Sequence, residues 1–164
     1  MDCGARLRAG ASGHGWDLAS ITSAEENAFV ITLFPGSLIA DSYYWLGAKR
    51  TVAAGPFAWL SGETFDYAAW WPGEPNNYQA EDYLTFYTNG AGSWGWNDAP
   101  DNGWGNVRGF VAERARGHGG SRTGLTRTAG VGTCGGSVGA SPSAGAALSP
   151  LPAPSRLGTA HRGR

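Results

Sequence analysis

Short runs of large apolar residues, each closed by a glycine or a polar turn, follow one another along the first two thirds of the chain. Short runs that are rich in aromatic and β-branched side chains are typical of strands. The pattern predicts strands at residues 16–21, 43–47, 57–60, 83–87 and 110–112. Long polar loops separate them, and no internal repeat is evident.

One segment has helical spacing instead, and it predicts a helix over residues 24–34. Ser23 and Glu26 form a capping box, in which the Ser23 hydroxyl accepts from the N–H of residue 26 and Glu26 reaches back. The proline at position 35 ends the helix. Its apolar face consists of residues at i, i+4 spacing, namely Phe29 with Leu33 and Val30 with Phe34. One helix, short strands and long loops favour the α+β class.

The composition of the chain changes sharply near residue 113. Every aromatic residue precedes residue 111, and the first 113 residues hold 13 acids and 5 basic residues. The remaining 51 residues hold 7 arginines and no acid. We therefore expect one folded domain over residues 10–115 and a separate tail over residues 116–164.

The tail consists mainly of Gly, Ala, Ser, Pro and Arg, and it has too few large apolar residues to offset its chain entropy. We interpret it as a disordered basic appendage. Such a segment attracts anions only weakly and without specificity, so neither nucleic-acid binding nor membrane insertion is predicted. Out-of-frame translation of GC-rich DNA gives the same composition, and the sequence leaves this alternative open.

Five oxygen-bearing side chains gather in the loop-rich stretch from residue 74 to residue 98, namely Glu74, Asn76, Glu81, Asn97 and Asp98. Hard cations such as Ca²⁺ take carboxylate and amide oxygens as ligands. Each amide also offers an N–H donor beside a carboxylate acceptor. A sugar hydroxyl can then bind the metal, donate to a carboxylate and accept from an amide. The set predicts a calcium-dependent carbohydrate-binding site.

Other kinds of site are poorly supported by the sequence. Cys3 and Cys134 have no further metal ligand at a useful spacing, and the three histidines are scattered. No apolar run is long enough to span a membrane, and the N-terminus lacks the apolar core of a signal peptide. Glu74 and Glu81 are a carboxylate pair of the kind that glycosidases use. Binding calcium would lower their pKa values and remove the acid that hydrolysis needs, so we predict that the protein is not an enzyme.

Seven short motifs follow one another along the chain, at residues 18–21, 25–30, 45–47, 73–77 (preceded by Trp70), 81–82, 96–98 and 110–113. They include Trp-Leu-Gly, Glu-Pro-Asn and Trp-Asn-Asp. In this order they resemble a C-type lectin-like domain, and the resemblance covers about residues 10–115. It implies the fold of that family, with short antiparallel sheets, one clear helix and long calcium-binding loops.

The resemblance also implies the principal calcium site of the family, and all five of its positions match here: Glu74, Asn76, Glu81, Asn97 and Asp98. Members with Glu-Pro-Asn bind mannose, fucose and N-acetylglucosamine type sugars. A cis bond before Pro75 is expected, as X–Pro bonds are the usual place for one. Trp104 and Trp94 lie in glycine-rich loops and are expected to stack on a sugar. The other tryptophans considered, Trp45, Trp59, Trp70 and Trp96, are expected in the core.

Three features depart from the family pattern, one of which is a longer loop between Glu81 and Asn97. The two disulfides of the family would fall at Ala112 with a position near Ala11, and at Tyr83 with a position near Asp101, so both bridges are expected to be missing. An auxiliary calcium site of some members needs acids where this chain has Arg50 and Ala54, and we expect that site to be absent.

These observations together predict a calcium-dependent lectin domain that binds mannose-type glycans. The alternative is a calcium-independent module that binds protein or a surface with the same fold. The habits of the family favour an extracellular or cell-surface location. Weak binding of a single sugar is expected to require several copies, either in an oligomer or within a larger protein.

Overall fold

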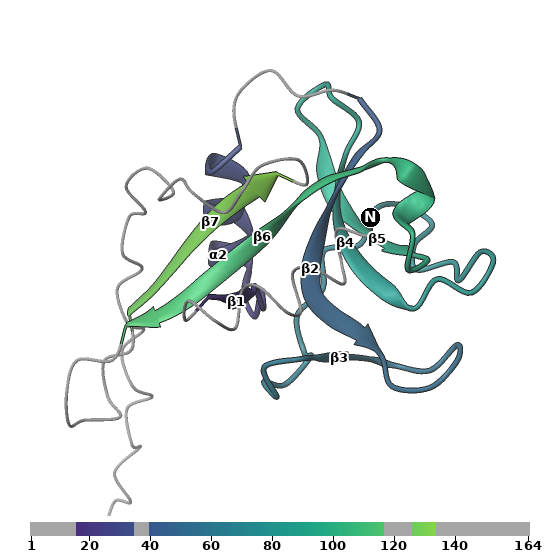
Figure 1. Ribbon diagram of the computed structural model, residues 1–164, viewed down its shortest axis with the longest axis horizontal. Coiled ribbons are helices and arrows are strands. Elements are labelled where there is room, and N and C mark those ends of the chain that lie inside the picture. Colours follow the sequence, from purple (N-terminus) through teal and green to yellow (C-terminus); the bar gives the residue numbers. More distant parts are fainter. Residues whose placement is uncertain (1–15, 35–39, 117–125, 134–164) are drawn as a thin grey trace, which may run out of the picture.

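Seven strands form one mixed sheet, and helix α2 packs against it (Figure 1). The computed structural model describes residues 16–34, 40–116 and 126–133. The elements in chain order are β1 (Asp17–Leu18), α2 (Ala24–Thr32), β2 (Ser42–Arg50), β3 (Phe57–Trp59), β4 (Tyr83–Thr88), β5 (Trp94–Ala99), the 3-10 turn η2 (Gly103–Gly105), β6 (Val107–Arg116) and β7 (Thr126–Thr133).

The sheet has the strand order β1-β6-β2-β4-β5, with β3 paired to β2 and β7 paired to β6. β2 and β6 run parallel, with Trp45 opposite Phe110, and the other strand pairs are antiparallel. The expectation of antiparallel sheets is therefore wrong for the central pair. The connection from β2 to β6 contains three further strands, which is long enough for the crossover that a parallel pair requires. The predicted α+β class is confirmed.

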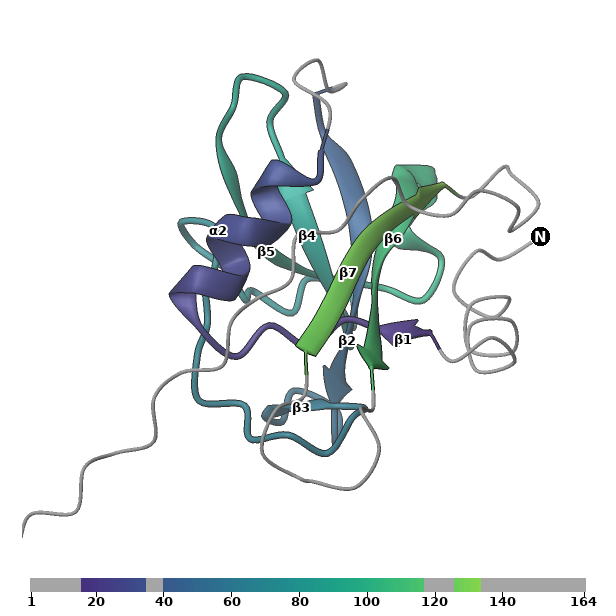
Figure 2. The same cartoon turned by 90° about the vertical axis from the view of Figure 1, so that its left-hand side faces the viewer.

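Helix α2 begins where the capping box predicts. The Ser23 hydroxyl accepts from the backbone N–H of Glu26 at 3.2 Å. The Glu26 carboxylate reaches back one residue further than expected, and it accepts from the Thr22 N–H at 2.6 Å and from the Thr22 hydroxyl at 2.9 Å. The Glu26 N–H, which the first turn would leave without a partner, is thus satisfied, and the chain before the helix is tied to its first turn. In Figure 2 the helix is seen in front of β4 and β5.

The centre of the core is Trp96, whose side chain has no exposed surface. Four rings pack edge-on against it, those of Trp59, Phe65, Tyr67 and Trp70. Its Nε1 donates to the Asn27 side-chain oxygen at 3.0 Å, which joins β5 to helix α2. Trp45 and Trp59 are buried and Trp70 packs half-buried on the core, as expected for these residues.

One part of the tail is a strand. β7 pairs with β6 over its whole length, from Arg116 opposite Thr126 to Gly109 opposite Thr133. Val131 packs against the main core. The expectation of disorder from residue 116 onward is therefore wrong for residues 126–133, because β6 offers this segment an edge of backbone donors and acceptors. The rest of the expected tail, as well as Cys3 and Cys134, lies outside the described residues.

Within the described part of the chain, the one helix is too short and too polar to cross a bilayer.

Candidate functional site

Two segments that are distant in sequence meet at one end of β4 and β5. Strand β5 carries Asn97 and Asp98, and Asp98 lies opposite Leu84 on β4. The long loop after β3 returns to the same end, because Glu81 lies two residues before β4 begins. The peptide bond between Glu74 and Pro75 in this loop is cis, as expected.

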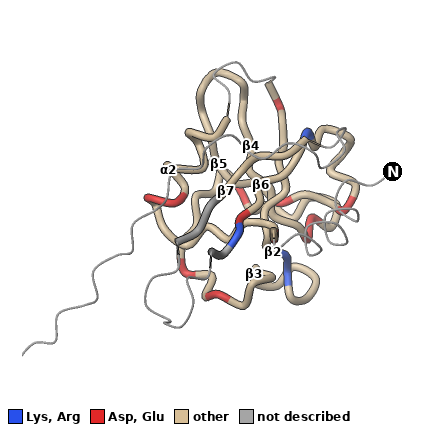
Figure 3. The backbone as a smooth tube through the Cα atoms, turned by 60° about the vertical axis from the view of Figure 1, so that its left-hand side comes forward, with Lys and Arg blue, Asp and Glu red and all other residues tan. Residues whose placement is uncertain are grey.

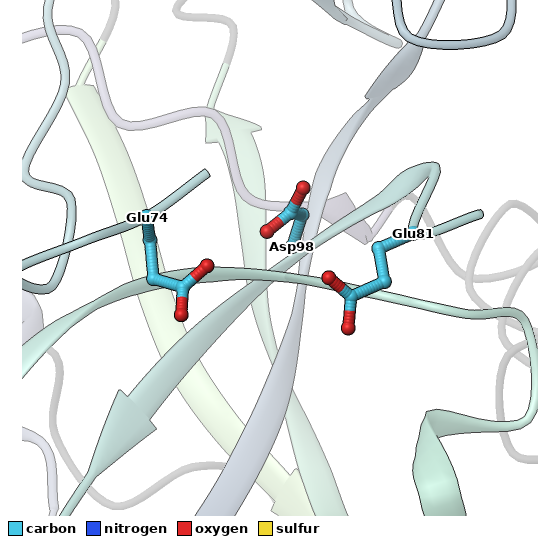
Figure 4. A group of neighbouring side chains, drawn as sticks. All are labelled: Glu74, Glu81 and Asp98. Carbon is cyan, nitrogen blue, oxygen red and sulfur yellow. The ribbon is translucent and has the colours of Figure 1, made fainter. Parts of the chain in front are cut away.

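Three carboxylates converge where these segments meet, as Figure 4 shows. One oxygen of each of Glu74, Glu81 and Asp98 lies within 4.8 Å of the others. Glu81 and Asp98 are buried, with exposed fractions of 1% and 0%, and Glu74 is half-buried. Among the described residues, this is the one group of three or more acids, histidines or cysteines whose ligand atoms lie so close together.

Backbone N–H groups of the loop point at all three carboxylates, and the Asn76 N–H donates to Glu74 Oε2 at 3.0 Å. Asn76 N–H donates to Asp98 Oδ1 at 3.2 Å, and Asn77 N–H donates to Asp98 Oδ2 at 2.9 Å. Tyr78 N–H donates to Glu81 Oε2 at 2.7 Å. The loop is therefore folded around the carboxylates by charge-assisted hydrogen bonds, which are stronger than neutral ones.

The two predicted amides, Asn76 and Asn97, belong to the same two segments as the carboxylates. The Asn76 side-chain nitrogen donates to Glu74 Oε1 at 2.9 Å, and its oxygen accepts from Tyr78 N–H at 2.7 Å. The side-chain oxygen of Asn97 is buried and has no hydrogen-bond partner within the protein. A buried oxygen without a partner is costly, and a bound cation would satisfy it.

The carboxylates disfavour one another's charge. Burial, with the nearby charge of Asp98, raises the pKa of Glu81 to about 7. Burial and a hydrogen bond shared with Asp98 also raise the pKa of Glu74. A positive ion among them would relieve both effects. The donor set is all oxygen, which suits a hard cation such as Ca²⁺. The residues present therefore fit calcium.

A cation of the chain itself lies behind the cluster. Arg50, the last residue of β2, donates from Nη2 to Asp98 Oδ2 at 2.6 Å. The end of β2 is one of the few basic segments in Figure 3. Sequence reasoning took Arg50 only as a departure from an auxiliary site and missed its contact with Asp98, 48 residues away.

Two exposed aromatic side chains are candidates for a contact with a sugar. Trp104, on η2, is 37% exposed and its ring centroid lies 5.7 Å from that of Tyr43. Tyr78 is 62% exposed and follows the ligand segment directly, which makes it a candidate that the sequence analysis missed. Its position two residues after Glu-Pro-Asn was the available signal. Trp94 packs instead on Phe34 and Phe86 in the core, so the expectation that it stacks on a sugar is wrong.

Residues 11–107 match the family described as the lectin C-type domain. This chain belongs to the C-type lectin domain family. Because the family is a class of carbohydrate-binding domains, the prediction that the chain is not an enzyme is confirmed, as is the predicted fold.

Relatives of this C-type lectin domain include salivary C-type lectin 2 of Aedes albopictus, which is 29% identical over 63% of this chain and 71% of its own length. An alpha-N-acetylgalactosamine-specific lectin of Patiria pectinifera is 33% identical over 49% of each chain, so this chain spans about half of that relative. Among solved structures, the C-type lectin CEL-I of Cucumaria echinata superposes with a TM-score of 0.51 at 27% identity. The match covers 62% of this chain and 76% of that one.

Proposed function

We propose that this C-type lectin domain binds glycans through a calcium ion held by the oxygens of Glu74, Asn76, Glu81, Asn97 and Asp98. One observation carries the proposal. Three carboxylates converge within 4.8 Å, and the residue next to Asp98 in sequence, Asn97, has a buried side-chain oxygen that lacks a partner. Such a group is costly without a cation and well suited to one.

Calcium, when bound, supplies a hard positive centre that sugar hydroxyl oxygens can join as ligands. The side chains of the protein determine which pairs of sugar hydroxyls can bind. Carboxylates of Glu74 and Glu81 accept from the hydroxyls, and the amides of Asn76 and Asn97 donate to them. The hydrogen bonds from the loop N–H groups to Asp98 and Glu81 hold these side chains in place before a sugar arrives, which lowers the entropy cost of binding.

We further propose that the preferred sugars are of the mannose, fucose and N-acetylglucosamine type. The support is the Glu-Pro-Asn triplet at residues 74–76, in which a carboxylate comes first and an amide second. The relative from Patiria pectinifera is named as specific for a different sugar, alpha-N-acetylgalactosamine, so the preference needs a direct test. Changing Glu74→Gln together with Asn76→Asp exchanges donor and acceptor around one hydroxyl and should move binding toward galactose. An array on which the double variant keeps its mannose preference would contradict this assignment.

Exposed rings suit the apolar face of a sugar. Tyr78 and Trp104 are the two large aromatic side chains that are exposed among the described residues. A ring of this kind buries a large area at a low entropy cost. We propose Trp104, as the sequence analysis does, and add Tyr78 as a second contact.

A calcium-independent module that binds protein or a surface is the second candidate. The ion pair between Arg50 and Asp98 favours it, because one of the three carboxylates already has a positive partner. The two functions differ in a simple way: chelator should abolish glycan binding by the first and leave binding by the second unchanged. The proposed location is outside the cell or on its surface, with several copies providing avidity.

The deciding experiment is a calorimetric calcium titration of the full chain, with mannose, galactose or neither present. Wild-type protein should bind calcium, and mannose should tighten that binding. Glu81→Gln should weaken calcium binding by at least the roughly 10–100-fold that the loss of a residue supporting a metal ligand causes. Asp66→Asn, which removes an exposed charge outside the cluster, is the matched control and should bind as wild type does. A folded wild-type protein that binds no calcium would make the second candidate the leading one.

A further inference from the structure

We infer that Arg50 is an internal cation that keeps the ligand loop folded when calcium is absent, and that it is in this sense a positioning residue of the proposed site. Its guanidinium reaches three separate segments. Nη2 donates to Asp98 Oδ2 on β5 at 2.6 Å. Nε donates to the backbone oxygen of Glu81 at 3.0 Å, and Nη1 donates to that of Gly55 at 2.8 Å.

Both partners of the ion pair are largely shielded from water. The Arg50 side chain is 7% exposed and that of Asp98 is 0% exposed. A buried carboxylate without a positive partner is strongly destabilising. Surface ion pairs contribute little by comparison. The contact between these two residues is therefore a requirement for placing Asp98 where it lies.

Asp98 in turn holds the loop. Its two oxygens accept from the backbone N–H groups of Asn76 and Asn77. Asp82, just before β4, is a second acidic partner of Arg50, and its Oδ1 lies 3.9 Å from Arg50 Nε. The backbone oxygen of Asp82 also accepts from the backbone N–H of Arg50 at 2.8 Å. A continuous set of contacts thus runs from the end of β2 through Asp98 to the loop, and it needs no metal.

The shape of arginine matters as well as its charge. Three nitrogens point to three acceptors, while the guanidinium carbon lies 4.6 Å from the centre of the Phe57 ring. A lysine offers a single charged nitrogen and lacks this fork. Lysine should therefore keep the charge beside Asp98 and lose part of the contact set.

The charge balance of the cluster follows. Three carboxylates and one guanidinium carry a formal charge of −2, which a divalent cation neutralises. If the proposed calcium function holds, Arg50 leaves the site ready for a divalent ion in a loop that is already folded. The positioning role itself concerns the calcium-free protein, so it stands or falls independently of calcium binding.

Hydrogen exchange of single backbone N–H groups in the full chain, read by NMR in chelator, tests this role. The reporters are the N–H groups of Asn76, Asn77 and Tyr78, and those of the β2–β4 ladder report on the fold. In wild-type protein the loop N–H groups should be protected without calcium. Arg50→Met should speed their exchange at least about tenfold and leave the ladder unchanged, because opening is local.

Two further variants separate charge from packing. Arg50→Lys should exchange faster than wild type, since part of the contact set is lost, and more slowly than Arg50→Met, since the charge beside Asp98 is kept. Lys49→Met, on the preceding exposed position of β2, is the matched control and should exchange as wild type does. Added calcium should restore protection to Arg50→Met if calcium binds.

Three results would overturn the inference. One is wild-type loop N–H groups that exchange without protection in chelator, a result that needs no variant and so stands even if Arg50→Met does not fold. The second is equal exchange in Arg50→Met and wild type. The third is Arg50→Lys that exchanges as fast as Arg50→Met. A wild-type protein that binds no calcium would instead remove the proposed function and leave the chelator measurements to decide on Arg50.

Discussion

The side chain of Glu81 is enclosed by the protein although it carries a carboxylate. It faces the carboxylates of Glu74 and Asp98, and burial is the main reason that its pKa is raised to about 7. The charge of Arg50 acts in the opposite direction and does not cancel the effect. A group in this state binds its proton more tightly in the folded than in the unfolded chain, which makes stability depend on pH.

The sign of that dependence gives a prediction for the calcium-free protein. Between the ordinary glutamate value of 4.5 and about 7, the folded state holds a proton on Glu81 that the unfolded state has lost. The contribution of Glu81 to stability should therefore fall as the pH rises through this range. Urea unfolding in chelator at pH 5 and pH 8 measures it. The difference between wild type and Glu81→Gln should change with pH, and a constant difference would contradict the assignment.

Single residues also show what the sequence reveals about the site. The convergence of the three carboxylates could be predicted, because the order of the motifs along the chain resembles that of a C-type lectin-like domain. Arg50 could not, because its partner Asp98 lies 48 positions away and only the pairing of β2, β4 and β5 brings the two together. Tyr78 is an exposed ring in a polar loop, and its position two residues after Glu-Pro-Asn was the one local signal for it.

Among the elements, helix α2 depends on the sheet through one buried hydrogen bond. Asn27 accepts from Trp96 Nε1 at 3.0 Å, and Trp96 is fully buried. Changing Asn27→Ala should lower the free energy of unfolding by about 1–3 kcal/mol, because it leaves a buried N–H without a partner. Urea denaturation measures this loss.

A double-mutant cycle with Trp96→Phe identifies the cause. If the hydrogen bond is responsible, Asn27→Ala should cost much less in the Trp96→Phe background. Equal costs in both backgrounds would mean that the loss arises elsewhere in the helix.

The predicted element boundaries were close to the observed ones where a local sequence signal was strong. They were wrong where pairing with another strand decides the boundary. The helix was predicted over residues 24–34 and spans Ala24–Thr32, since the capping box is a local feature. β2 and β6 extend well beyond their apolar runs, to Arg50 and Arg116, because neighbouring strands pair with charged segments as readily as with apolar ones. β7 carries no large aromatic residue, and its pairing with β6 is what makes it a strand.

At the scale of the whole molecule, β7 covers an edge that would otherwise be open. It comes from beyond residue 107, where the match to the family ends. A chain that ends at residue 116 should expose the β6 backbone and self-associate, whereas a chain that ends at residue 133 should not. The shorter chain should also unfold at a lower temperature, by about 4–8 °C for each kcal/mol of unfolding free energy that it loses. Light scattering and thermal unfolding of the two chains compare them, and identical behaviour would show that β7 adds nothing.

The parallel pairing of β2 with β6 determines when, during synthesis, the domain can fold and begin to bind. Trp45 pairs with Phe110 and Asp17 pairs with Glu113, so both early strands pair with a segment that is made much later. Contacts between positions so far apart in sequence form slowly, because a long loop must close first. All five proposed ligands leave the ribosome before β6 does. The nascent chain therefore carries a complete set of ligands on an unfinished sheet, and binding should begin only after translation has passed β6.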